Sequence, residues 1–488
     1  MIALVPRPVS LVERKGTFRI PSRAIAQAGS ADSPVSVRID PAHLPPEGYR
    51  LSVAPEGISI VAGGDAGAFH ARTTLLQLVP PGALASSRAG LERPWPVPCV
   101  EIVDHPRFSW RGLMLDTCRH FFPVEFVKKF IDTLAFHRMN VFHWHLSEDQ
   151  GWRIEIRRHP ELTDVGAWRT GTLVGRLPSE EPWEFDAVRH GGFYTQGEVR
   201  DVVAYASERH VTVVPEIEMP GHAQAALAAH PELSCTGGPF EVSRMWGIHE
   251  DVFCAGNDAV FALLEDVIDE VTALFPGPFF HIGGDECPKA RWKACPKCQA
   301  RMRAEGLADE DALQSWFIRR IERMVTARGK RLVGWDEILE GGLAPNATVM
   351  SWRGVDGGIE AARQGHDVVM SPTTHCYLDY QQASAPAGEP IAFDAYLPLE
   401  KVYSYEPVPA ELTPEQGRHV LGVQGNLWTE YIATPERAEY MSWPRACALA
   451  EAGWSPGGAR DWGDFLVRLA AHLPRLGALG VRYRAPDR

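Results

Sequence analysis

The sequence predicts a (β/α)8 barrel preceded by a small N-terminal α/β domain, and three observations support this prediction. The pattern of the chain changes near residue 106, after which short β-branched or aromatic runs alternate with longer helical stretches. About eight such units follow one another, enough to close a parallel barrel. Polar and aromatic residues collect just after the apolar runs, where barrel enzymes hold their functional groups. We therefore expect a non-catalytic domain over 1–106 and a catalytic barrel over 107–488.

The N-terminal domain shows both strand and helix patterns. Alternating apolar residues predict strands over 48–53 and 57–61, and a helical pattern runs over 65–79. Pro80 and Pro81 end that helix, because proline cannot continue it. A loop over 81–87 and a proline-rich segment over 94–98 follow near the end of the domain.

In the second domain each predicted strand is a short, mostly apolar run. The predicted strands are 112–115, 141–146, 211–217, 279–283, 331–335, 348–352, 367–371 and 420–426. The clearest helical patterns between them are 124–137, 197–209, 258–275 and 311–328. We expect each strand to be followed by a helix, as in other barrels of this kind.

Composition excludes several functions. A formal charge of −13 and the lack of a basic run argue against a nucleic-acid surface. No apolar stretch approaches the roughly 20 residues that span a bilayer, so we expect no membrane partner. The first residues lack the sustained apolar region of a secretory signal, which leaves a cytoplasmic protein or a trimmed secreted form as alternatives.

The nine cysteines are too few for a disulfide framework in a chain of 488 residues. Cys235 and Cys254 bracket a loop of about 20 residues and could pair. Cys287, Cys295 and Cys298 cluster further on, but no fourth metal ligand is evident at a familiar spacing. A packed or free thiol cluster is the favoured interpretation, and no metal is expected there.

The most informative motif is the segment 281–286, His-Ile-Gly-Gly-Asp-Glu, which follows an apolar run. Its glycines allow the backbone to bend, and its two carboxylates are typical of general acid chemistry on a glycosidic bond. On an extended segment Asp285 and Glu286 would point to opposite sides, so they are poorly placed to act as separate nucleophile and acid. One acid and one helper group fit this spacing better.

The other predicted strand ends are also rich in polar and aromatic side chains. Three tryptophans and a tyrosine there suggest an aromatic box for the apolar face of a sugar. Histidines after the second and third strands raise the alternative of a metal, but His143, His145 and His222 lack a complete ligand pattern. The residues concerned include Asp116, Arg119, Glu148, Asp149, Glu216, Glu218, Trp335, Asp336, Glu337, Trp352, Arg353, His375, Tyr377, Asp379, Trp428 and Glu430.

These motifs together resemble those of family 20 glycoside hydrolases, the β-N-acetylhexosaminidases. The matching segments are 115–122, 142–153, 215–222, 281–286, 334–337, 377–379 and 424–430, in the family's order over about 320 residues. The N-terminal domain is also similar to the non-catalytic domain that precedes the barrel in this family.

The resemblance implies an exo-acting enzyme that releases terminal β-linked GlcNAc or GalNAc without a cofactor. Its mechanism would be substrate-assisted: the 2-acetamido oxygen attacks the anomeric carbon and forms an oxazolinium ion. Glu286 would be the general acid and base, Asp285 would hold the acetamido N–H, and Tyr377 would donate to the acetamido oxygen. Binding residues would be Arg119, Trp335, Trp352, Asp379, Trp428 and Glu430, with Glu148, Glu218 and His222 tuning Glu286.

Two features keep alternatives open. Glu148 and Glu218 stand where aspartate is frequent in the family, and the extra methylene changes their reach. A disaccharide-releasing relative would differ in the loops around the pocket, and an inactive paralogue could use the barrel only to bind sugar. A chitinase-like barrel is disfavoured, since it needs an Asp-x-x-Asp-x-Asp-x-Glu spacing that the fourth strand lacks.

Overall fold

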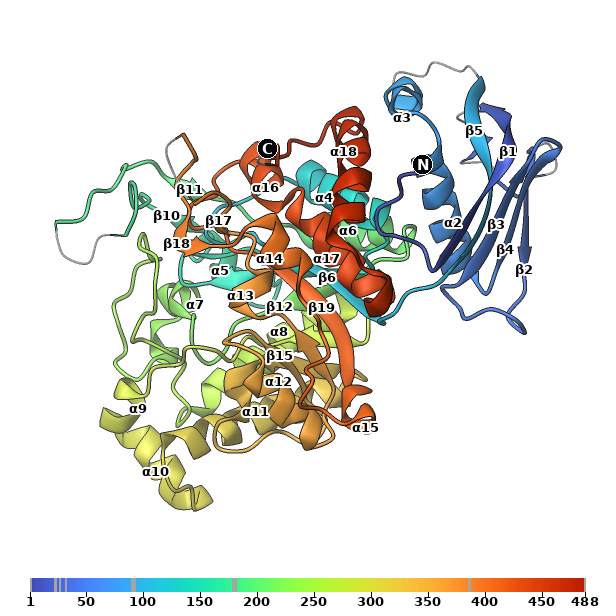
Figure 1. Ribbon diagram of the computed structural model, residues 1–488. Coiled ribbons are helices and arrows are strands. Elements are labelled where there is room, and N and C mark those ends of the chain that lie inside the picture. Colours follow the sequence, from blue (N-terminus) through green and yellow to red (C-terminus); the bar gives the residue numbers. More distant parts are fainter. Residues whose placement is uncertain are drawn as a thin grey trace.

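The computed structural model describes residues 2–21, 24–25, 28–30, 33–88, 94–177, 182–384 and 388–486. Figure 1 shows a small domain, coloured blue, beside a larger body that holds the rest of the chain. The smaller domain is a five-stranded mixed sheet with helices, and the larger one contains a closed parallel barrel of eight strands. The predicted fold class is confirmed.

The N-terminal sheet has the strand order β1-β5-β3-β4-β2, and the helix α2 shares its apolar core. Pro81 starts a helix, so the predicted loop over 81–87 is wrong. Proline suits the first helical position, where its fixed φ fits and no N–H is needed. The elements are β1 (Ser10–Pro21), β2 (Val35–Ile39), β3 (Tyr49–Ala54), β4 (Gly57–Ala62), α2 (Asp65–Leu78), α3 (Pro81–Arg88) and β5 (Pro94–Asp104).

The proline-rich segment 94–98 forms the first half of β5. In this half β5 pairs only with β1, through Pro96 to Arg19 and Pro98 to Thr17. The strand β3 joins the other side of β5 only from Val100 onward. Prolines at alternate positions can therefore face the side of β5 that has no partner strand, where no N–H is needed. This is the edge position in which a strand tolerates proline.

The barrel closes in the order β12-β13-β14-β15-β16-β19-β6-β7, and every pairing is parallel. Each strand overlaps one of the eight predicted apolar runs. The strands are β6 (Trp110–Asp116), β7 (Val141–His145), β12 (Thr212–Glu216), β13 (Phe279–His281), β14 (Arg331–Trp335), β15 (Thr348–Ser351), β16 (Val368–Met370) and β19 (Val420–Leu427).

The four predicted helices are present with ends shifted by at most two residues, as α4 (Val124–Phe136), α6 (Gln196–Ser207), α8 (Asp258–Leu274) and α11 (Glu310–Ala327). The expectation of a helix after every strand is wrong for β14, which is followed by no α-helix and only by the short 3₁₀ helix η2 (Asp336–Leu339). The segment after η2 contains Gly341, Gly342 and Pro345, residues that disfavour a helix. Gly341 also has a φ of +69°, and a Cβ there would lie 2.3 Å from the Asp311 carbonyl oxygen.

The remaining elements belong to the long loops and the C-terminal helices. They are β8 (Ser147–Glu148), β9 (Gly151–Trp152), α5 (Glu161–Asp164), β10 (Trp168–Arg169), β11 (His190–Gly191), α7 (Gln224–Ala229), η1 (Pro231–Leu233), α9 (Ala290–Ala294), α10 (Pro296–Glu305), α12 (Asp356–Arg363), α13 (Thr373–Cys376), β17 (Tyr380–Gln381), β18 (Phe393–Tyr396), α14 (Leu399–Tyr403), α15 (Pro414–Gly417), α16 (Pro435–Ser442), α17 (Arg445–Trp454), η3 (Gly457–Ala459) and α18 (Trp462–Ala478).

The two domains share a buried polar contact. Asp104, the last residue of β5, accepts a hydrogen bond from the Trp454 indole N–H at 2.9 Å and pairs with Arg138 at 3.4 Å. The predicted boundary after residue 106 falls in the connection between β5 and β6. Within the described ranges, no helix has both the length and the apolar character that crossing a membrane requires.

Candidate active site

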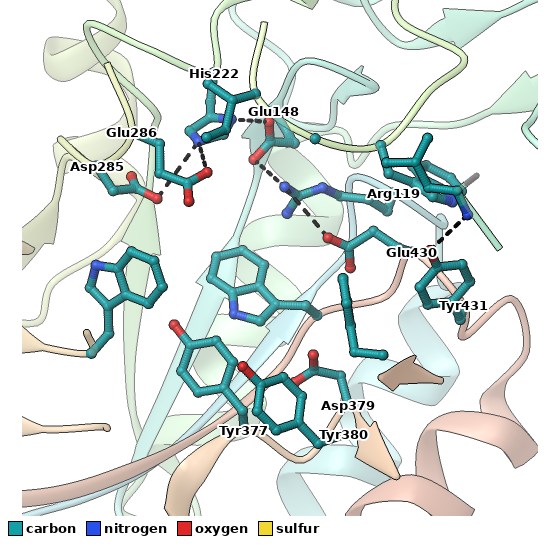
Figure 2. A pocket seen from close by; sticks show the side chains of 17 residues that line it. Arg119, Glu148, His222, Asp285, Glu286, Tyr377, Asp379, Tyr380, Glu430 and Tyr431 are labelled. Atoms are coloured by element: carbon teal, nitrogen blue, oxygen red, sulfur yellow. Dashed lines mark hydrogen bonds and ion pairs between the residues drawn. The ribbon is translucent and has the colours of Figure 1, made fainter. Parts of the chain in front are cut away.

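A cavity of about 290 Å³ opens at the carboxyl ends of the barrel strands, the face on which such barrels hold their functional groups. Its wall carries carboxylates, an arginine, a histidine and aromatic rings (Figure 2). The lining residues are Arg119, Glu148, Leu177, His222, Trp246, Gly247, Ile248, Asp285, Glu286, Trp352, Tyr377, Asp379, Tyr380, Phe393, Trp428, Glu430 and Tyr431.

Asp285 and Glu286 face the same cavity, so the predicted opposite orientation is wrong. The strand β13 ends at His281, and the backbone after it is not extended: φ is +65° at Gly283 and +45° at Glu286. Glycine is favoured at position 283, because its φ is positive and because a Cβ there would lie 1.7 Å from Oε2 of Glu218 unless that side chain moved. His222 Nε2 lies 3.7 Å from Asp285 and 3.6 Å from Glu286, so one imidazole lies beside both carboxylates.

His222 belongs to a buried chain of charges. Its Nδ1 lies 2.8 Å from Glu148 Oε1 and 3.1 Å from Asp149 Oδ2, and Arg119 pairs with Glu148 at 3.0 Å. Burial opposes ionisation of Glu148, but Arg119 and His222 outweigh it and hold the pKa of Glu148 well below its usual range. The same carboxylates raise the pKa of His222 well above its ordinary value despite its burial. A charged imidazole next to Asp285 and Glu286 follows from these contacts.

Asp285 has an environment unlike that of a surface aspartate. Burial raises its pKa to about 7; His222 opposes this shift, whereas the neighbouring Glu286 adds to it. Its Oδ1 is buried and makes no hydrogen bond within the described part of the chain. A buried acceptor of this kind is a place where a ligand donor would be stabilised.

The opposite end of the cavity holds Arg119, Asp379 and Glu430 (Figure 2). Both carboxylate oxygens of Asp379 and Oε2 of Glu430 are buried without a hydrogen-bond partner among the described residues. Burial raises the pKa of Glu430 to about 7, and burial together with Glu430 raises that of Asp379 well above its ordinary value. Several unsatisfied acceptors beside a guanidinium match the hydroxyls of a sugar.

Aromatic rings form the walls between these two ends. Trp352 and Tyr377 stack with centroids 6.1 Å apart and an angle of 23° between their planes. Trp428 is held by the Arg119 guanidinium, which lies 5.0 Å from its ring centre. Trp335 does not line the cavity: its side chain is buried beside Trp428, and its indole N–H donates to Glu216 at 2.8 Å.

Glu218 also lies outside the lining. It is buried, and neither carboxylate oxygen has a hydrogen-bond partner among the described residues. Burial, followed by the charges of Asp285 and Glu216, raises its pKa well above the ordinary value. Of the three residues predicted to tune Glu286, Glu148 and His222 line the cavity, and Glu218 is buried outside its lining.

The histidines of the second strand end gather around Glu216, and His145 also lies 3.3 Å from Glu148, which contacts His222. His143 Nε2 lies 3.1 Å from Glu216 and His281 Nδ1 lies 2.9 Å from the same carboxylate, which His145 also contacts. Burial lowers the pKa of His143 to about 4, whereas Glu216 and Glu148 raise that of His145 to about 10 despite its burial. This cluster is buried in the barrel and does not line the cavity. The loop residues that complete the cavity wall were not predicted, since no sequence spacing marks them: Leu177, Trp246, Gly247, Ile248, Tyr380, Phe393 and Tyr431.

All nine cysteines are free, so the bridge considered between Cys235 and Cys254 is not formed. The predicted grouping of Cys287 with Cys295 and Cys298 is also wrong. The fold brings Cys235 and Cys254 to Cys295 and Cys298, and Cys287 stays outside this group.

Asp379 offers a test of this end of the cavity. Because the folded protein holds the Asp379 proton more tightly than the unfolded chain, ionisation weakens the fold as pH rises from the ordinary aspartate range. Asp379→Asn is therefore expected to raise Tm at pH 7 by roughly 1–4 °C, with the gain shrinking near pH 4. The same variant should lose about 10- to 100-fold in kcat/KM through lost hydrogen bonds to substrate. The exposed Asp164→Asn serves as control and should change neither Tm nor kcat/KM.

The fold and the cavity define a class of protein, the barrel glycoside hydrolases, because paired carboxylates face sugar-binding acceptors across aromatic walls at the catalytic end of the barrel. Family comparison then identifies the chain. It belongs to glycosyl hydrolase family 20: the model of the family's catalytic domain matches residues 108–457, and the model of its domain 2 matches residues 18–105.

Individual relatives agree with this assignment. A β-hexosaminidase of Porphyromonas gingivalis is 53% identical over 91% of this chain, which spans 55% of that relative's length. A β-hexosaminidase of Akkermansia muciniphila is 35% identical over 88% of this chain and 83% of its own. An exo-β-N-acetylglucosaminidase from Vibrio harveyi, solved with N-acetylglucosamine, aligns with a TM-score of 0.87 at 36% identity, covering 99% of this chain and 78% of its own. The Streptomyces plicatus N-acetyl-β-hexosaminidase gives 0.84 at 32% identity, covering 99% and 96%.

Proposed function

We propose that this chain is an exo-acting β-N-acetylhexosaminidase that releases terminal, non-reducing β-linked GlcNAc or GalNAc by a substrate-assisted retaining mechanism. The observation that carries the proposal is the joint placement of Asp285 and Glu286 beside His222 at one end of the cavity. The relatives support it through their named activity, and the Vibrio harveyi enzyme binds N-acetylglucosamine.

The cavity favours a single sugar ring. Its volume of about 290 Å³ is at the small end of the range for ligand sites. Arg119, Asp379 and Glu430 at the end opposite Glu286 would bind the hydroxyls of that ring. A chain of several sugars would have to extend past Glu286, whose side chain is one-third exposed. Cleavage would then remove one terminal residue at a time.

In the first step Glu286 gives its proton to the glycosidic oxygen as the bond to the anomeric carbon breaks. The substrate's acetamido oxygen forms the new bond to that carbon and yields an oxazolinium ion with net positive charge on the acetamido group. Asp285 accepts a hydrogen bond from the acetamido N–H and offsets the charge, and the Tyr377 hydroxyl donates to the acetamido oxygen. An internal nucleophile held in this way benefits from a high effective concentration.

In the second step Glu286, now a carboxylate, takes a proton from water as the water oxygen attacks the anomeric carbon. The bond to the acetamido oxygen breaks, and the sugar leaves with its original anomeric configuration. His222 lies within 3.7 Å of Asp285 and 3.6 Å of Glu286. Its positive charge would stabilise both carboxylates when they are ionised, and Arg119 and Glu148 hold it in place.

An aryl-glycoside panel tests the proposal with β-GlcNAc, β-GalNAc, β-glucoside and a β-linked N-acetylated disaccharide. Turnover of β-GlcNAc or β-GalNAc is expected, and the β-glucoside, which lacks the internal nucleophile, should react at least about 10³-fold more slowly. Comparable rates on the glucoside would contradict substrate assistance. Release of the intact disaccharide would identify a disaccharide-releasing enzyme, and sugar binding without any turnover would identify an inactive paralogue.

A further inference from the structure

Four cysteine thiols gather away from the catalytic cavity. Cys235, Cys254, Cys295 and Cys298 place their sulfur atoms within 4.8 Å of one another. Three of the four side chains are buried, and Cys235 is half-buried. The catalytic proposal uses none of them.

The spacing of the sulfur atoms matches a tetrahedron. The sulfur of Cys298 lies 3.6 Å from that of Cys254 and 3.8 Å from that of Cys235, and Cys254 and Cys295 are 3.7 Å apart. Four thiolates bound at about 2.3 Å to one central ion lie about 3.8 Å from each other. Disulfides would instead bring pairs of sulfur atoms to about 2.05 Å.

The backbone around the thiols is built for close approach. Cys295 caps α10 and Cys298 lies in its first turn, so the Cys-x-x-Cys segment presents both sulfur atoms on one side. The chain carrying Cys254 passes directly against this segment at Gly256, where a Cβ would lie 2.2 Å from the Lys297 carbonyl carbon. The position of Cys254 is fixed by its N–H bond to the Leu233 carbonyl at 2.9 Å. Trp292 adds an indole N–H bond to the Phe253 carbonyl at 2.9 Å.

The segment that carries Cys295 and Cys298 is basic in sequence. The chain as a whole carries a formal charge of −13, yet the segment 287–304 contains no Asp or Glu. Four thiolates around a divalent ion carry a net charge of −2. Three of the nearby cations, Lys289, Arg291 and Arg301, already pair with carboxylates outside the segment. The basic residues of this segment are Lys289, Arg291, Lys293, Lys297, Arg301 and Arg303.

We propose that Cys235, Cys254, Cys295 and Cys298 form a structural four-thiolate site for one zinc ion. Soft sulfur ligands in tetrahedral array select Zn²⁺ over Mg²⁺ or Ca²⁺, and a complete set of four protein ligands leaves no open position for catalysis. Binding converts four thiols to thiolates and releases up to four protons to solvent, without any change in oxidation state.

The site would join two loops that build the catalytic cavity. Cys235 and Cys254 belong to the connection between β12 and α8, which also carries His222 and Trp246. Cys295 and Cys298 belong to the connection between β13 and α11, which also carries Asp285 and Glu286. In Figure 1 the helices α9 and α10 of this second connection lie at the periphery of the larger body. Zinc would fix the two loops, and with them His222 against Asp285 and Glu286.

Metal analysis of the full chain, purified without a metal-affinity tag or chelator, tests the proposal. We expect elemental mass spectrometry to find about one zinc per chain. This zinc should be released when a mercurial reagent titrates the thiols. Growth with cobalt should give sulfur-to-cobalt charge transfer in the near ultraviolet and the visible bands of tetrahedral Co²⁺. Cys235→Ser and Cys298→Ser should each lower the zinc content at least several-fold and lower Tm. Cys99→Ser, which removes a buried thiol from the N-terminal domain, should keep one zinc per chain.

The wild-type measurements decide the matter even if the variants fold poorly. Absence of zinc together with nine titratable thiols would overturn the proposal. Absence of zinc together with the loss of thiols in pairs would show that the cysteines form disulfides, which would also overturn the proposal. Bound zinc that survives in both serine variants would place the metal elsewhere in the chain.

Discussion

Glu286→Gln is expected to lower kcat by about 10²–10⁴-fold on substrates with poor leaving groups, the usual range for general acid catalysis. Glutamine keeps the size of the side chain but has no proton to give to the glycosidic oxygen. The same variant should lose far less on a dinitrophenyl glycoside, whose leaving group needs little protonation. The measurement is kcat for a series of aryl glycosides of rising leaving-group pKa, in the parent and in the variant.

The slope of log kcat against leaving-group pKa carries the test. A steeper slope in Glu286→Gln than in the parent would identify Glu286 as the acid. An equal loss on every substrate would show that Glu286 acts in some other way, such as in binding. Azide added to the variant should not restore a slow first step, since azide supplies no proton.

Asp285→Asn is expected to lower kcat by about 10²–10³-fold with little change in the binding of product sugar. The substitution keeps size and hydrogen-bonding capacity and removes only the charge. That charge matters when the acetamido group becomes positive, so its loss falls on the transition state and leaves the ground state nearly unchanged. Steady-state kinetics combined with product affinity separates these two effects.

Two further measurements sharpen this test. A thiazoline that mimics the cyclic intermediate should bind Asp285→Asn much more weakly than it binds the parent. Since burial raises the pKa of Asp285, the parent should also lose kcat/KM on acidification at a higher pH than an ordinary aspartate would produce. The asparagine variant should lack this acidic limb. Unchanged thiazoline affinity with full activity would refute the role assigned to Asp285.

The barrel was predictable because its signal is local. Apolar runs such as 331–335 and 420–426 are short, bounded by polar residues and separated by helical patterns, and each became a strand. The fifth unit shows the limit of the rule that a helix follows each strand, because Gly341, Gly342 and Pro345 disfavour one after β14. The sequence did not indicate that the proline-rich segment before Val100 belongs to β5. A strand tolerates these prolines only because β3 does not pair with this half of β5, and that depends on the tertiary structure.

Part of the candidate site was likewise predictable from local sequence, and part was not. The motif carrying Asp285 and Glu286 marks their position at a strand end, and the family resemblance assigns roles that the substitutions above test. Their shared orientation toward His222 depends on positive φ angles after β13, which sequence periodicity does not encode. Trp335 has the same strand-end position as a pocket residue, yet its ring turns inward to Glu216.

The sequence by itself determined the order of strands and helices, the acidic motif at the end of the fourth barrel strand and the family resemblance, since each rests on neighbouring residues or on short motifs. Tertiary structure alone decided which loops close the cavity, which charges meet at His222 and which thiols gather. Cys235 and Cys298 are 63 residues apart and have sulfur atoms 3.8 Å from each other. Such contacts depend on how the closed barrel brings the ends of adjacent strands together, and no local pattern in the chain specifies them.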